Sequence, residues 1–220
     1  MVIVGLTGSI GMGKSTAAKM LREMGVPVYD ADAAVHELQA PGGAALPGIE
    51  AAFPGVVKAG VLDRQALGAR VFGNKEALRR LEAIVHPLVF KKQRAFLRRA
   101  ALDGEKLVVL DIPLLFEGLG ERRVDATLVV SAPAFLQRRR VMARPGMTAE
   151  KFAGILRQQV PDTLKRRKAT IVIPTGMGLA PTRAALVRAV ARLRTLPGRF
   201  WPPNPWREKF TARLARARRK

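Results

Sequence analysis

The segment that most restricts the fold of this 220-residue chain lies near its start. Residues 8–15 read GSIGMGKS, which matches the pattern G-x-x-x-x-G-K-[ST]. A short apolar run at 2–7 precedes the pattern, and residues that favour helix follow it up to Met24. Strand, loop and helix in this order are the context in which the pattern forms a phosphate-binding loop. A chance glycine loop before an ordinary helix would have to meet both pattern and context by accident.

Each residue type in this loop has a chemical reason to be there. Glycines let the backbone curl so that successive N–H groups point at phosphate oxygens, and the helix N-terminus adds its positive end. Lys14 can reach the β- and γ-phosphates of a nucleoside triphosphate, and the Ser15 hydroxyl can bind Mg²⁺. We therefore predict an ATP site that uses Mg²⁺ and is formed by Gly8, Gly11, Met12, Gly13, Lys14, Ser15 and Thr16.

Four further apolar runs, at 26–29, 107–111, 127–130 and 170–173, predict buried strands. Continuous apolar runs separated by helical stretches are typical of a parallel sheet covered on both faces. We therefore predict an α/β fold of the P-loop nucleoside triphosphate hydrolase or kinase type, with a five-stranded parallel sheet.

The stretch between the second and third predicted strands is too long for a structureless loop. Helical patterns at 64–72, 75–85 and 88–102 predict a helical insertion that could hold a substrate. Residues 134–168 are also predicted to be helical, with breaks at Pro145–Gly146 and at Pro161, followed by an amphipathic helix at 182–196. The predicted parts are a nucleotide-binding core (1–32, 103–133 and 169–196), a helical acceptor-binding insertion (33–102), a lid (134–168) and a basic C-terminal extension (197–220).

Three carboxylates stand at the ends of predicted strands. Asp111 ends the run LVVLD, the position of a second acidic group near a metal. Asp30 and Asp32 follow the second strand, and in an extended segment both would face the same side. A carboxylate there can accept the proton of an attacking hydroxyl in phosphoryl transfer. The alternative for each of the three is a residue that only caps a turn or helix.

Two further features of the helical regions bear on chemistry. Arg140 and Arg144 are four residues apart and would share a helix face, which suits a lid that closes over a phosphoryl group. A solvated basic face is the alternative. By themselves, His86 and Pro87 indicate a helix boundary with a packed histidine more than a ligand site.

The chain carries a formal net charge of +22, with 39 Lys and Arg against 17 Asp and Glu. Nucleic acid, acidic lipid, a polyphosphate substrate and mere Arg-rich composition all fit that number. The charge is concentrated in 137–168, which we expect to face phosphate-rich substrates, and in 197–220. Aromatic residues of the extension could stack on bases, but we favour packing of a Pro-rich chain onto the body, and expect no specific nucleic acid. These aromatic residues are Phe200, Trp201, Trp206 and Phe210.

The chain has no cysteine and two histidines, which excludes a disulfide scaffold, a thiolate metal site and a Cys nucleophile. Residues 1–7 lack the basic region of a secretory signal, and no apolar run approaches the roughly 20 residues of a membrane helix. We therefore expect a cytoplasmic protein without a membrane partner, and favour a monomer.

Taken in order, the motifs resemble those of the dephospho-coenzyme A kinase family. They are GSIGMGKST at 8–16, VYDAD at 28–32, HPL at 86–88 and DIPLLFE at 111–117, followed by the Arg-rich lid. The first is generic to P-loop proteins, whereas the other three at these spacings discriminate far better. The resemblance implies ATP-dependent phosphorylation of the ribose 3′-hydroxyl of dephospho-CoA, which gives CoA and ADP in the last step of CoA biosynthesis.

The resemblance also implies residue roles. Asp32 would be the base or orienting carboxylate, Arg140 would stabilise the transferring phosphoryl group, and Lys14 would complete the catalytic set. From the residues themselves we further expect Arg144 to join the ATP site, and Ser15 and Asp111 to hold the metal. The acceptor site would comprise Asp30, His86, Pro87, Leu114, Leu115 and Glu117.

The chain departs from the family pattern in two places. The family's late segment usually reads A-D-x-V-I-x-N-x-G, whereas this chain has ATIVIPTG at 169–176. Thr170 and Thr175 therefore stand where an acidic residue and an Asn are usual. An Arg-Asp pair is common where Arg144 and Pro145 stand. A P-loop kinase for a nucleoside or sugar would need another acceptor motif in place of DAD and HPL. A nucleic-acid-binding ATPase is the hypothesis from a different class.

Overall fold

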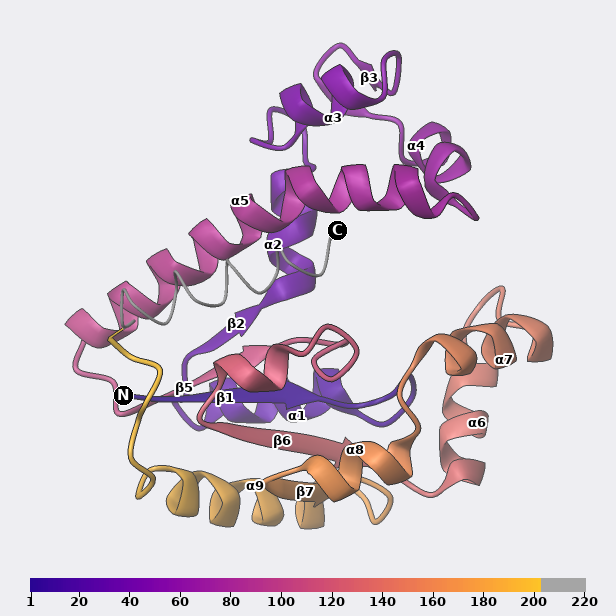
Figure 1. The fold of residues 1–220 in the computed structure, drawn as a ribbon. Helices are drawn as coiled ribbons and strands as arrows, with labels where there is room; N and C mark the ends of the chain where they lie inside the picture. The colour runs from indigo at the N-terminus through magenta and orange to yellow at the C-terminus, as the bar shows by residue number, and fades with distance from the viewer. Residues whose placement is uncertain (203–220) are drawn as a thin grey trace. The chain divides into compact units, whose positions relative to one another are not determined.

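The computed structural model describes residues 1–202, which fold as two units (Figure 1). One unit comprises Met1–Val28 and the described residues from Asp103 on, and the other comprises Tyr29–Leu102. Each has its own cluster of buried apolar side chains. Most of the predicted basic extension, including Trp206 and Phe210, lies outside the described residues.

The first unit is built on a five-stranded sheet with the strand order β2-β5-β1-β6-β7, of which β2 continues into the first residues of the second unit. Strand β1 pairs in parallel with β5 and β6, and β6 with β7; Val4 of β1 lies opposite Val109 of β5, and Leu6 opposite Leu128 of β6. The predicted α/β fold with five parallel strands is therefore confirmed, with ends that differ by one or two residues. The strands are β1 (Val2–Thr7), β2 (Val28–Asp30), β5 (Leu107–Asp111), β6 (Ala126–Ser131) and β7 (Ile171–Pro174).

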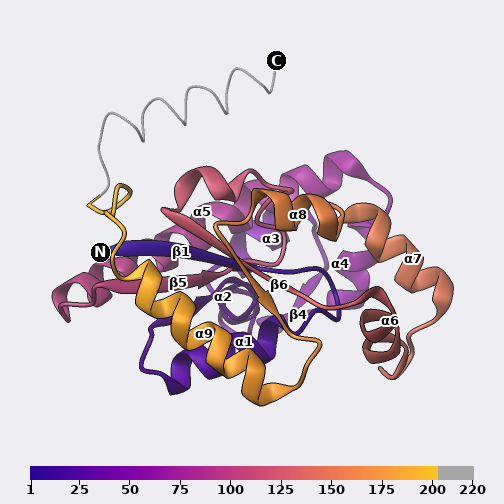
Figure 2. The same ribbon diagram turned by 90° about the horizontal axis from the view of Figure 1, so that it is seen from below.

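Helices cover the sheet because each buries an apolar stripe on it. Helices α1 (Lys14–Glu23) and α9 (Leu179–Leu193) lie along one face, where their buried residues join those of the strands (Figures 1 and 2). Helix α8 (Asp162–Lys168) contacts β6. Helix α9 begins and ends three residues earlier than predicted.

Helices α6 (Ala134–Met142) and α7 (Ala149–Gln158) lie beyond the carboxyl ends of β1 and β6 (Figure 1). The predicted breaks occur where expected: a turn containing Gly146 at φ 71° separates α6 from α7, and Pro161 precedes α8. A short 3₁₀ helix, η1 (Gly120–Arg123), precedes β6.

The second unit is mainly helical. Its long helix α5 (Lys75–Leu102) packs with the shorter helices around one apolar cluster. The Gly- and Pro-rich segment 41–48 is typical of a loop, but α3 already begins at Leu46, with Pro47 in its first turn, where proline is tolerated. The other elements are α2 (Ala31–Leu38), α3 (Leu46–Ala52), α4 (Arg64–Val71) and the hairpin of β3 (Val57–Lys58) and β4 (Val61–Leu62).

The predicted helix boundary at His86–Pro87 is wrong. Pro87 lies inside the 28-residue helix α5, although proline removes one helical hydrogen bond. Packing offsets that loss, since Val85 before the proline and Leu88 and Val89 after it belong to the same apolar cluster.

Candidate active site

The phosphate loop, residues 8–15, connects the central strand β1 to helix α1. Gly11 and Gly13 adopt φ values of 78° and 89°, a left-handed conformation that favours glycine. Gly13 is the N-cap of α1, and no side chain caps the helix. The first N–H groups of α1 therefore remain for an anion at the carboxyl end of the sheet.

The carbonyl groups of this loop are held by side chains from elsewhere in the first unit. Three successive carbonyl oxygens, those of residues 10–12, each accept a hydrogen bond from α6 or from the residue after β7. This fixes the direction of the peptides within the loop, because each carbonyl bonds away from it. The bonds are Gln137 Nε2 to Ile10 O (2.8 Å), Arg140 Nη1 to Gly11 O (3.4 Å) and Thr175 Oγ1 to Met12 O (2.7 Å).

The loop is also packed too closely to accept side chains at its glycines. A Cβ added to Gly11 would lie 2.6 Å from Val141 Cγ2, and one on Gly13 would lie 3.3 Å from Thr175 Oγ1. The amide N–H of Ile10 donates to Gln159 Oε1 at 3.1 Å, so the chain after α7 contacts the loop as well. Residues predicted to form the lid thus help to shape the phosphate loop.

Lys14 and Asp111 form an ion pair at the carboxyl ends of the adjacent strands β1 and β5. Lys14 Nζ lies 2.6 Å from Asp111 Oδ1, and Asp111 is only 2% exposed. A buried carboxylate of this kind requires a charged partner. Asp111 therefore forms an ion pair beside the phosphate loop, and its role at a metal stays a prediction.

The oxygen donors at this point suit Mg²⁺ better than a softer metal. Ser15 is exposed in the first turn of α1, and Asp111 supplies a carboxylate beside Lys14. Within residues 1–202 no three His, Cys, Asp or Glu side chains gather as a metal cage. Mg²⁺ is usually held by one or two protein oxygens with substrate phosphates and water, so such a cage is not required.

Asp30 and Asp32, both in the second unit, differ in what their carboxylates contact. Asp30 is the N-cap of α2, where its Oδ1 accepts a hydrogen bond from Ala33 N at 2.9 Å. Asp32 is exposed in the first turn of that helix. The prediction that both face the same side of an extended segment is wrong, because α2 begins at Ala31.

The predicted arginine pair is also separated. Arg144 lies beyond the end of α6 at Met142, so it does not share a helix face with Arg140. Proline disfavours helical geometry in the residue before it, and Pro145 follows Arg144. Arg140 does reach the phosphate loop, because its Nη1 donates to Gly11 O. Its Nη2 donates to Thr175 O at 2.7 Å, outside the loop.

The HPL residues lie on α5. His86 and Pro87 are both exposed, and the His86 ring stands edge-on to Phe90 at 6.3 Å between centroids. The expectation of a packed histidine is therefore wrong. An exposed imidazole beside an aromatic ring is available to a ligand.

The DIPLLFE motif divides into exposed and buried parts. Leu114 is 50% exposed, whereas Leu115 is fully buried and packs against Gly5, whose added Cβ would lie 2.7 Å from Leu115 Cδ2. The assignment of Leu115 to the acceptor wall is thus corrected, since a fully buried side chain contacts no ligand.

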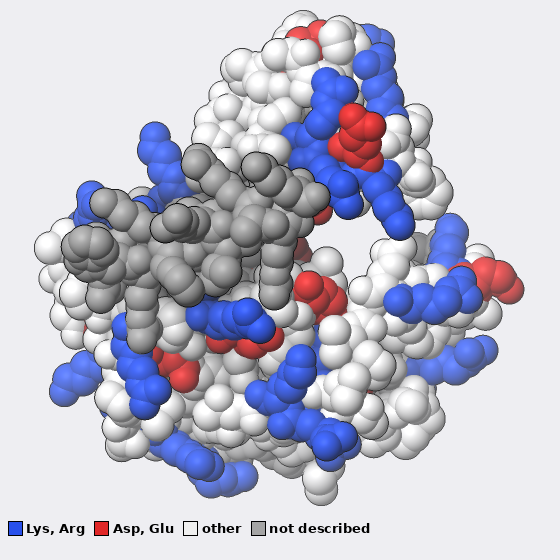
Figure 3. All heavy atoms as spheres, in the orientation of Figure 1, with Lys and Arg blue, Asp and Glu red and all other residues white. Residues whose placement is uncertain are grey.

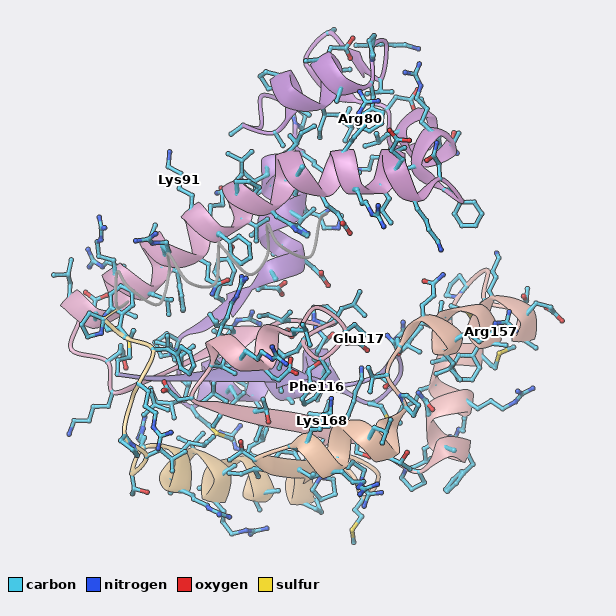
Figure 4. All side chains as sticks on the ribbon, viewed as in Figure 1. Arg80, Lys91, Phe116, Glu117, Arg157 and Lys168 are labelled. Carbon is cyan, nitrogen blue, oxygen red and sulfur yellow. The ribbon has the colours of Figure 1, made fainter. Side chains whose placement is uncertain are left out.

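Glu117 is directed at the chain between α7 and α8 (Figure 4). Its Oε1 accepts a hydrogen bond from Val160 N at 2.8 Å and lies 2.9 Å from Lys165 Nζ, which is fully buried. Sequence reasoning missed Lys165 because it begins a basic run whose other members are exposed. It also missed Gln137, Gln159 and Thr175 as partners of the loop, because their contacts with it join segments far apart in the sequence.

The described surface is rich in positive charge. Lys and Arg side chains are spread over the face seen in Figure 3, with fewer Asp and Glu among them. Such a field attracts anionic ligands. Over residues 1–202, no helix is long and apolar enough to cross a membrane.

Comparison with known proteins gives consistent matches over most of the chain. The sequence model of the dephospho-CoA kinase family matches residues 2–180. A dephospho-CoA kinase of Novosphingobium aromaticivorans is 62% identical over 191 residues, which are 86% of this chain and 94% of that protein. A crystal structure from Thermus thermophilus aligns with a TM-score of 0.76 at 39% identity, covering 87% of this chain and 96% of its own. A dephospho-CoA kinase structure from Campylobacter jejuni gives a TM-score of 0.58 at 26% identity, with coverage of 87% and 96%.

Proposed function

The chain belongs to the dephospho-CoA kinase family, and from that premise we propose how its own residues transfer a phosphoryl group from ATP to dephospho-CoA. This reaction is the last step of CoA biosynthesis. The observation that carries the proposal is the preformed phosphate loop, with the Lys14–Asp111 ion pair at its end. Such a site binds a polyphosphate in a fixed orientation, which is most of what phosphoryl transfer demands of a protein.

On the donor side, the N–H groups of the loop and of the first turn of α1 would bind the ATP phosphates. Lys14 would exchange Asp111 for phosphate oxygens when ATP binds, because the ammonium group serves either anion. Arg140 has five N–H donors, more than its three contacts with Gly11 and Thr175 use. It would therefore stay at the loop while it stabilises the transferring phosphoryl group.

Ser15 and Asp111 would hold Mg²⁺, Ser15 through its exposed hydroxyl and Asp111 through the carboxylate that Lys14 releases. When bound, the ion neutralises charge on the phosphate oxygens. Oxygen donors and a single carboxylate fit its preferences.

On the acceptor side, Asp32 would accept the proton of the ribose 3′-hydroxyl. The 3′-oxygen would form a bond to the γ-phosphorus of ATP, while the bond from that phosphorus to ADP breaks. Asp32 suits this role better than Asp30, whose carboxylate already caps α2. His86, Pro87 and Leu114, all exposed, would contact dephospho-CoA. Glu117 would not contact the ligand itself but would hold the backbone at Val160 in position.

We also propose that the enzyme acts in the cytoplasm, where ATP is supplied, and as a monomer. ADP release with ATP, Mg²⁺ and an acceptor panel of dephospho-CoA, adenosine and gluconate tests the proposal. We expect turnover on dephospho-CoA, with the product phosphate on the ribose 3′-oxygen by ³¹P NMR. Turnover on another acceptor alone would overturn the proposal.

A further inference from the structure

Thr175, the residue after β7, connects three parts of the first unit through one side chain. It is 6% exposed. Its Oγ1 lies 2.7 Å from Met12 O in the phosphate loop, 3.2 Å from Ser131 O at the end of β6 and 3.5 Å from Arg140 Nη1. Its carbonyl oxygen accepts a second, shorter bond from Arg140 Nη2 at 2.7 Å.

The direction of the hydroxyl proton follows from these distances. A hydroxyl has one proton to donate. Ser131 O already accepts the Thr175 backbone N–H at 2.8 Å, and it is farther from Oγ1 than Met12 O. The proton therefore goes to Met12 O, which leaves the oxygen lone pairs for Arg140.

The apolar part of the side chain fits as closely as the polar part. Gly13 packs against Thr175, since an added Cβ there would lie 3.3 Å from Thr175 Cβ and 3.5 Å from its Cγ2. Gly13 is the N-cap of α1, so Thr175 contacts the point where the phosphate loop becomes helix.

We propose that Thr175 is a positioning residue for the triphosphate of ATP. Its hydroxyl holds the Met12 carbonyl away from the ligand, so that the following N–H groups face the phosphates, and it holds Arg140 against the same loop. The inference rests on the proposed function only in that the loop binds ATP.

Thr175→Val tests the hydroxyl, because valine keeps the shape and loses the donor. We expect the Kd for ADP, measured calorimetrically without acceptor, and the KM for ATP to rise about tenfold, as for a buried carbonyl left without its donor. The KM for dephospho-CoA should change less than about twofold. Thr175→Ser keeps the hydroxyl and should stay within about threefold of the wild type for ADP.

Thr182→Val is the matched control. Thr182 is also buried, and its Oγ1 lies 2.7 Å from Gly178 O and 3.3 Å from Pro174 O, neither of which belongs to the phosphate loop. Thr182→Val should bind ADP as the wild type does. Equal losses in Thr175→Val and Thr182→Val would overturn the proposal, as would wild-type ADP affinity in Thr175→Val.

Thr175→Ala provides a second variant if valine impairs folding, since the smaller side chain imposes no new contact. It too should lose about tenfold in ADP affinity, and wild-type affinity would overturn the proposal. ADP binding does not depend on the acceptor. A wild-type protein that binds ADP but does not phosphorylate dephospho-CoA would therefore contradict the proposed function and leave the Thr175 test intact.

Discussion

The phosphate loop of the first unit and the acceptor residues of the second are held in different ways. The backbone of residues 10–12 is bonded by side chains that are more than 120 residues away in the sequence. Asp32, His86 and Pro87, in contrast, are exposed on helices, where the local helix geometry sets their positions. The donor site is built from long-range contacts, whereas the acceptor residues are displayed by local structure.

This contrast has an energetic meaning. A preformed site does not need to be ordered when its ligand binds, and dipoles already aligned on the transition state require no reorganisation. Changes around the loop should therefore affect nucleotide binding and folding together. Changes at the exposed acceptor residues should affect turnover with little effect on the free energy of unfolding.

The largest effect is expected from Lys14→Ala. It removes the charge that we expect to contact the phosphates, and with it the ion pair to the buried Asp111. We expect kcat/KM to fall roughly 10³-fold, the upper range for one preorganised electrostatic group. Steady-state kinetics on purified protein measure this loss. Lys19→Ala on the same helix is the control, because Lys19 is exposed and should leave kcat/KM unchanged.

Asp32→Asn tests the acceptor side. It should reduce kcat by at least roughly 10²-fold, the contribution of a positioned base, and change the unfolding free energy by less than about 0.5 kcal/mol. Asp30→Asn is the comparison, since asparagine caps a helix as well as aspartate does. If Asp30→Asn loses more turnover than Asp32→Asn, Asp30 is the base and its cap is secondary.

Lys165→Met tests whether the long-range contacts of the first unit also stabilise its fold. The change leaves the Glu117 carboxylate without its cation, at a site where Lys165 is fully buried. We expect a loss of about 3 kcal/mol in urea unfolding, near the lower end for a broken buried pair because Val160 N still donates to Glu117. Arg183→Ala, which breaks the exposed pair with Glu23, should cost under about 1 kcal/mol.

The smallest effect concerns the second unit at high pH. Burial, with the negative charges of Glu37 and Asp30, raises the pKa of Tyr29 to about 12. The unfolded chain loses this proton near pH 10 while the folded chain keeps it, so stability should fall by about 2 kcal/mol as the pH rises from 10 to 12. Tyr29 is the chain's one tyrosine, so tyrosinate absorbance follows it directly. Tyr29→Phe should remove this contribution, and tyrosinate absorbance appearing near pH 10 in the folded protein would contradict it.

The sequence predicts the elements of the first unit well because they leave local signals. The strands are continuous apolar runs, the loop is a motif, and the breaks at Gly146 and Pro161 follow from residue chemistry. Pro87 misled the prediction in the second unit, because packing on both sides keeps the helix intact against a local breaker.

In the candidate site, too, residues with a local sequence signal were predicted and residues placed by long-range contacts were not. Asp111 could be placed at the carboxyl ends of the strands because it ends an apolar run, but its ion pair with Lys14 was not predicted. The wall position of Leu115 and the shared helix face of Arg140 and Arg144 were wrong, because burial and helix ends depend on contacts that spacing does not encode. Thr175 and Lys165 were missed because their roles exist only once distant segments meet.

The outward bonding of the carbonyls of residues 10–12 has one more consequence. Each peptide has a dipole whose positive end is the N–H group. Because the carbonyls of residues 10–12 bond to α6 or to the residue after β7, the N–H ends of these peptides point away from those partners. The attraction of the loop for anions is then partly built into groups that do not titrate in water. Nucleotide affinity in Lys14→Ala should accordingly persist in weakened form, and vary between pH 7 and 9 no more than the ionisation of the nucleotide does.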